Sequence, residues 1–148
     1  MKGFVQDIKV LASQNSKFRR VLYTGSGLQL VLMSLKSDED IGEEVHDDRD
    51  QFFLVEKGKG EIWIDGTTTK IHRGMCMLVP AGARHNVLNT GNRKLRLATV
   101  YGPPQHADGA VHVTRQDAQS SAEAFDGITT EHVMPQGPAV GETSADTD

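Results

Sequence analysis

Short strand-like runs separated by turn residues fill the middle of the chain and constrain its fold more than any other feature. The runs lie at residues 28–36, 43–47, 51–57, 61–65, 67–72, 76–79, 84–89 and 95–101. Gly, Asn or Asp stands between each run and the next, and Asp65-Gly66 is the strongest hairpin signal. Because no helical period interrupts the series, it predicts an all-β sandwich or barrel and argues against alternating β–α–β units.

The segments on either side of this series have a different character. The beginning of the chain is mixed, and its stretch "FRRVLYTGSG" is interpreted as a strand or a loop. Alternation ends after Pro103, and Thr114 is expected to cap a short helix that runs to about Phe125. The last segment has no Lys or Arg and few large apolar residues, so we expect it to be disordered. The predicted divisions are a lead-in, a barrel, an extension with the helix, and the tail, at residues 1–27, 28–104, 105–125 and 126–148.

Composition and charge argue against several classes of partner. A chain of 148 residues has room for one domain with a proper core. Its net charge of −4 and the lack of any Lys/Arg block argue against nucleic acid and anionic membrane as partners. No apolar run approaches the ~18 residues of a membrane span, and "MKGFVQDIKV" lacks the apolar stretch of a signal peptide. Cys76 is the only cysteine, which predicts a small buried apolar residue in a cytoplasmic protein without an internal disulfide.

The most specific motif spans residues 74–89, "GMCMLVPAGARHNVLN". Gly74 permits a tight turn into a buried strand, and Pro80 with Gly82 reverses the chain. The strand that follows is expected to present His85 and Asn89 on the same face. At every fixed position this stretch resembles the second sequence motif of the cupin superfamily.

An altered form of the first cupin motif precedes it in "GEEVHDDRDQFFLVEKG". The family pattern is Gly, five residues, His-x-His, three or four residues, Glu, six residues, Gly. Counting back from Gly58 places Gln51 at the Glu position, His46 at the first histidine and Asp48 at the second. Gly42 is closer to His46 than in the family pattern, and the spacing from Asp48 to Gln51 is one residue short.

The resemblance covers roughly residues 28–101 and implies a double-stranded β-helix, the cupin jelly-roll barrel, with ligands in its mouth. The layout is similar to small single-domain bacterial cupins described as mannose-6-phosphate-isomerase-like, and it suggests a homodimer. The ligands that it implies for a divalent transition metal ion (Fe, Mn, Ni or Zn) are His46, Asp48, Gln51 and His85.

Strand parity limits how these residues can meet. His46 and Gln51 have opposite parity, so a regular strand would direct them to opposite faces. A bend or bulge between them would bring both into the barrel. Asp47 and Asp50 are open alternatives to Asp48, and all three carboxylates could instead belong to a solvated turn.

Two functions fit such a site. The first is a metal-dependent enzyme on a small polar metabolite such as a sugar or sugar phosphate, with isomerase-like proton transfer or dioxygenase chemistry. The second is a non-catalytic cupin that binds a metal or small ligand for sensing or sequestration. His106 and His112 in "PPQHADGAVH" either close over the barrel mouth or are exposed or locally hydrogen-bonded histidines.

Overall fold

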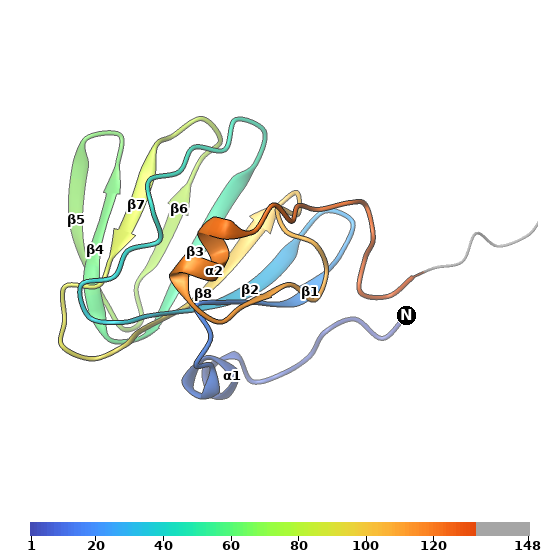
Figure 1. Ribbon diagram of the computed structural model, residues 1–148, viewed down its shortest axis with the longest axis horizontal. Helices are drawn as coiled ribbons and strands as arrows, with labels where there is room; N and C mark the ends of the chain where they lie inside the picture. The colour runs from blue at the N-terminus through green and yellow to red at the C-terminus, as the bar shows by residue number, and fades with distance from the viewer. Residues whose placement is uncertain (133–148) are drawn as a thin grey trace, which may run out of the picture.

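The computed structural model describes residues 1–132, which form two antiparallel β-sheets and two short helices (Figure 1). The strands are β1 Arg19–Thr24, β2 Gln29–Leu35, β3 Asp50–Lys57, β4 Lys59–Ile64, β5 Thr67–His72, β6 Cys76–Val79, β7 His85–Leu88, β8 Leu95–Gly102 and β9 Val111–His112. The helices are α1 Ile8–Gln14 and α2 Arg115–Ser120. One sheet has the strand order β6-β3-β8-β2-β1-β9 and the other β5-β4-β7. The predicted all-β architecture is therefore confirmed, and no helix within residues 1–132 is long and apolar enough to cross a membrane.

The predicted strand at residues 43–47 is wrong. Only one isolated bridge forms there, between Glu44 and His85. Gly42 adopts a φ of +90° on one side of this bridge, and Asp47 and Asp48 form a turn on the other. The extended conformation is thus interrupted on both sides, and the segment runs antiparallel beside β7 through scattered main-chain hydrogen bonds without forming a continuous strand.

The core lies between the two sheets and consists of inward-facing residues from both. Phe53 and Val55 on β3, Val79 on β6 and Val87 on β7 are each at most 2% exposed, as the alternation predicts. Burying a side chain of this size stabilises a fold by about 1.5–3 kcal/mol relative to exposure. Cys76 is exposed, contrary to the prediction, because it has the opposite parity to Val79 on β6 and lies on the outer face of the sheet.

The N-terminal lead-in contains a helix that the sequence did not reveal, and a strand, β1, within the stretch that was interpreted as a strand or a loop. Asp7 caps helix α1, and its side chain accepts hydrogen bonds from two main-chain N–H groups of the first turn. Its Ala12 packs against Leu32 and Ala98 on the outer side of the six-stranded sheet. Strand β1 pairs with β2 and so belongs to the same sheet as the predicted barrel strands.

The C-terminal segment follows the predictions only in part. Thr114 caps α2 with a complete capping box, but the helix ends at Ser120, before the expected Phe125. Residues 126–132 of the expected disordered tail lie along the fold, where the Thr130 N–H donates to the carbonyl of Thr24 at 2.9 Å. The remainder of that prediction, residues 133–148, lies outside the described residues.

Candidate metal centre

Three side chains from two segments converge at one end of the barrel, two of them from the stretch before β3 and one from β7. Glu44, His46 and His85 each offer one ligand atom, and these atoms all lie within 4.8 Å of one another. The Oε2 atom of Glu44 is 3.2 Å from Nε2 of His46 and 4.0 Å from Nε2 of His85. Donor atoms that share one ion at bond lengths of about 2.0–2.2 Å are separated by about 3–4 Å. The spacing of this group therefore suits a single divalent ion.

Main-chain hydrogen bonds hold the group together. The N–H of Glu44 donates to the carbonyl of His85 at 2.9 Å, and the N–H of His85 donates back to the carbonyl of Glu44 at 2.9 Å. The N–H of Gly82 donates to the carbonyl of His46 at 2.8 Å. Gly82 itself has a φ of +87°, a conformation in which glycine avoids the strain of other residues. The turn of the second motif thus fixes both histidines to the same end of the barrel.

Gln51 faces His85 from the start of β3, with its Oε1 atom 3.1 Å from Nε2 of the histidine. The Gln51 Nε2 atom donates to Oγ1 of Thr99 at 3.0 Å, and the Thr99 hydroxyl donates to the carbonyl of Phe52 at 2.9 Å. The hydroxyl proton is therefore directed away from Gln51. This arrangement turns the carbonyl oxygen of the Gln51 amide towards the imidazole.

His85 consequently meets hydrogen-bond acceptors at both ring nitrogens, because its Nδ1 atom lies 3.2 Å from the carbonyl oxygen of Ala83. A neutral imidazole carries only one proton, so one of the two nitrogens directs a lone pair at an oxygen. Burial lowers the pKa of His85, which disfavours the doubly protonated form. A cation between Nε2 and Gln51 Oε1 removes this conflict, since Nδ1–H then donates to Ala83, as metal-bound histidines commonly do with a carbonyl. The residues present therefore fit a metal ion.

The predicted ligands are only partly brought together. His46, Gln51 and His85 lie around one point, and the turn at Asp47 supplies the bend that parity requires. Asp48 lies apart from them, with its side chain 72% exposed and both carboxylate oxygens paired with the guanidinium of Arg49 at 2.9 and 3.1 Å. The alternatives do not replace it, because Asp47 and Asp50 are also exposed.

Glu44 is the carboxylate that the sequence reasoning missed. It stands two residues before His46 and so shares its parity, which was the available signal. Burial raises the pKa of Glu44, but the hydrogen bond with His46 and the positive charge of Arg19 outweigh this effect and lower it. The carboxylate is thus held ionised, as a metal ligand requires.

A chain of polar side chains runs from this group towards α2. His46 meets Tyr101 edge to face, with ring centroids 5.9 Å apart. The Tyr101 hydroxyl is 3.4 Å from Nε2 of His106, whose Nδ1 atom is 2.7 Å from Glu123. Nε2 of His112 is 3.7 Å from the same Glu123 oxygen. His106 and His112 are only 8% and 6% exposed, which excludes exposure among the alternatives considered for them, and both have hydrogen-bond partners.

A cavity of about 120 Å³ adjoins the group on the side of Glu44. Its lining includes Phe18, Arg19, Ile41, Glu44, Arg115 and Gln119. Because Arg115 and Gln119 both belong to α2, the helix forms one wall of the approach to the centre.

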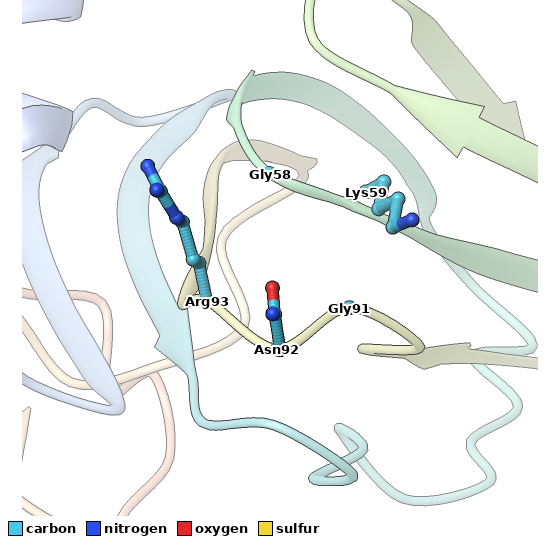
Figure 2. A pocket seen from close by; sticks show the side chains of 5 residues that line it. All are labelled: Gly58, Lys59, Gly91, Asn92 and Arg93. Carbon is cyan, nitrogen blue, oxygen red and sulfur yellow. The ribbon is translucent and has the colours of Figure 1, made fainter.

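A second hollow, of about 250 Å³, lies at the opposite end of the barrel (Figure 2). Gly58, Lys59, Gly91, Asn92 and Arg93 line it. Gln51 lies near the start of β3, and Gly58 follows its end. In the same way, His85 starts β7, and Gly91 lies beyond its end. Its two cationic side chains are exposed and no carboxylate or imidazole is among its lining residues, so it offers no comparable chemistry.

Comparisons with known proteins agree with this architecture. The model of the cupin domain family matches residues 31–101. The chain is 40% identical over 128 residues to the uncharacterised protein YrkC of Bacillus subtilis, covering 82% of this chain and 69% of that one. It is 38% identical to the uncharacterised protein L612 of Acanthamoeba polyphaga mimivirus, covering 80% and 76% respectively.

Solved structures give the same result. BH2720 from Bacillus halodurans superposes with a TM-score of 0.80 at 41% identity, covering 81% of this chain and 96% of that one. KdgF from Halomonas superposes with a TM-score of 0.55 at 16% identity, covering 57% and 76%, which shows a shared fold alone.

Proposed function

This chain belongs to the cupin superfamily, and from that premise we propose that it is a metal-dependent enzyme acting on a small polar metabolite. Glu44, His46 and His85 would hold a divalent transition metal ion, with Gln51 beside them. The observation that carries the proposal is the convergence of these four side chains. It is supported by His85, whose two ring nitrogens each meet a hydrogen-bond acceptor, a conflict that a cation at Nε2 would remove. Two histidines and one carboxylate suit Fe, Mn, Ni or Zn and leave coordination positions for a metabolite.

The chemistry that such an ion supplies is polarisation of a carbonyl or hydroxyl group, or a lowered pKa of bound water. The protein's own residues prepare the site for it. Ala83 fixes the ring of His85 through Nδ1, and Thr99 fixes the amide of Gln51. Hydrogen bonds of this kind hold the side chains around a metal ion in a fixed orientation.

Proton-carrying side chains beside the centre favour turnover over simple binding. Tyr101 is 1% exposed, contacts the ring of His46, and is linked through His106 to Glu123. A hydroxyl–imidazole–carboxylate series could carry protons between a bound metabolite and the edge of the barrel. We therefore favour isomerase-like proton transfer on a sugar or sugar phosphate. A homodimer and a cytoplasmic location are further proposals, which rest on the family resemblance and on the cysteine content.

Metal analysis and a turnover screen on the purified full chain test this function. We expect a stoichiometric transition metal that is lost in His85→Ala. The metal-loaded protein should convert at least one compound from a panel of sugars, sugar phosphates and oxidisable small molecules. Tyr101→Phe should keep the metal and lose the conversion. Metal binding with saturable ligand binding but no product would instead favour the sensing or sequestration function.

A further inference from the structure

Arg19 is a buried cation that supports the ionised state of Glu44 through its charge but is not itself one of the candidate ligands. It begins β1, and its side chain is only 7% exposed. Nη1 lies 3.3 Å from Nδ1 of His112, and Nη2 lies 4.0 Å from Oε1 of Glu44. Its Nε atom is buried without any hydrogen-bond partner among residues 1–132. A guanidinium offers five N–H donors, and the one on Nε is free in this arrangement.

The charge of Arg19 is also incompletely compensated. A guanidinium–carboxylate hydrogen bond normally measures about 2.7–2.9 Å, and the contact with Glu44 is more than 1 Å longer. The other oxygen of Glu44, Oε2, is directed at His46, so this carboxylate is shared between the centre and Arg19. Buried charges are costly unless they are paired. The arrangement therefore suits a further anion next to Arg19.

Space for such an anion adjoins Arg19. The cavity of about 120 Å³ has Arg19 and Glu44 in its wall, which is room for a group of several heavy atoms. On the α2 side, the Arg115 guanidinium lies 2.7 Å from the Asp40 carboxylate, and its Nε donates to the Asp40 carbonyl at 2.9 Å. Arg115 is thus already neutralised, and Arg19 is the cation of this cavity that lacks a carboxylate at hydrogen-bond distance.

We propose that Arg19 binds a carboxylate or phosphate group of the ligand in this cavity, so that the metabolite is an acidic small molecule. The proposal rests on the proposed function, because it assigns the anionic end of a ligand whose reacting end would lie at the centre. The planar fork of a guanidinium matches the oxygens of both groups in a way that a lysine does not. Glu44 faces Arg19 with one oxygen and His46 with the other. The anionic end of the ligand at Arg19 would therefore lie next to its reacting end at the centre.

Titration calorimetry on the purified full chain tests the proposal with three probes: acetate, inorganic phosphate and the neutral acetamide. We expect acetate or phosphate to bind saturably and acetamide not to bind, and the tighter anion identifies the group. Arg19→Gln should weaken anion binding at least about tenfold. The matched control is Arg20→Gln, which removes the same charge from the neighbouring, exposed position of β1 and should leave binding unchanged.

Two further variants make the result decisive. Arg19→Lys keeps the buried charge without the fork and should give an intermediate affinity for acetate, which serves as the test if the Gln variant does not fold. His85→Ala, which removes a candidate metal ligand, should retain anion binding. Wild-type affinity in the Arg19 variants, loss of binding in His85→Ala, or no anion binding by the wild type would each overturn the proposal. Arg19-dependent binding in a chain without metal would instead support the anion site and contradict the proposed function.

Discussion

The main chains of Glu44 and His85 exchange two hydrogen bonds of 2.9 Å, and their side chains then meet with Oε2 and Nε2 4.0 Å apart. This bridge joins the segment before β3 to the first residue of β7. Because the backbone sets the position of both side chains, a substitution at either one removes donor atoms without releasing the segment. Variants at this bridge can therefore separate metal binding from folding.

Acid is expected to destabilise the fold between about pH 6.5 and pH 4. Burial, and then the charge of Arg19, lowers the pKa of His106 to about 4 in the folded protein, against an ordinary value of about 6.5. In this window the unfolded chain binds the extra proton more readily, so stability falls as pH falls, and above the window the effect vanishes. Burial lowers the pKa of His85 and His112 in the same direction. Urea unfolding of the chain at about pH 7.5 and pH 4.5 measures the loss.

The contribution of His106 can be isolated by substitution. His106→Gln should lose less stability between the two pH values than the wild type, whereas His72→Gln, at an exposed position, should match the wild type. If His106→Gln lost as much stability as the wild type, the pKa of His106 would not differ between the folded and the unfolded protein.

Two neighbouring positions on β5, of which only one is buried, are expected to give opposite results on substitution. Ile71 is 2% exposed and belongs to the core, while Lys70 is exposed. Ile71→Ala should cost about 2–5 kcal/mol in the free energy of unfolding, because it removes buried methyl groups and leaves a cavity. Lys70→Ala should stay within about 0.5 kcal/mol of the wild type. Comparable losses in the two variants would mean that the strand is in a different register.

Two glycines with the same backbone conformation are expected to differ on substitution. Gly58 and Gly66 both have a φ of +90°, so alanine at either position carries left-handed strain of about 1–2 kcal/mol. At Gly58 an added Cβ would lie 2.7 Å from the carbonyl oxygen of Lys94, whereas at Gly66 nothing lies within 4 Å. Gly58→Ala should therefore be clearly the less stable variant in thermal unfolding, and equal melting temperatures would contradict the close approach.

Much of the β-fold could be predicted from the sequence where turn residues and alternation agree. Strands β5 and β6 occur at the predicted residues, and Gly66 and Gly74, which mark turns before them, both adopt the left-handed conformation. Helix α1 was missed because it is short and only Ala12 of it is fully buried. Its stability depends on packing against the sheet, and a single short segment does not reveal such packing.

The candidate site was predictable in its histidines and not in its carboxylate. Motif spacing indicated His46 and His85. The pairing of Glu44 with His85 depends on main-chain hydrogen bonds between segments far apart in the sequence, and these have no local signature. Asp48 holds the expected motif position, yet the turn directs it outwards to Arg49. The burial of His106 likewise depends on Glu123, which reaches it from beyond the end of α2.

The metal content of Glu44→Gln and Asp48→Asn, compared with the wild type, tests the central claim most directly. Both variants replace a carboxylate with an amide of the same shape within the same segment, so they form a matched pair. Elemental analysis of the purified proteins should find a stoichiometric transition metal in the wild type and in Asp48→Asn, and strongly reduced metal in Glu44→Gln. A metal-free wild type, or metal lost from Asp48→Asn and retained by Glu44→Gln, would contradict a centre built on Glu44, His46 and His85.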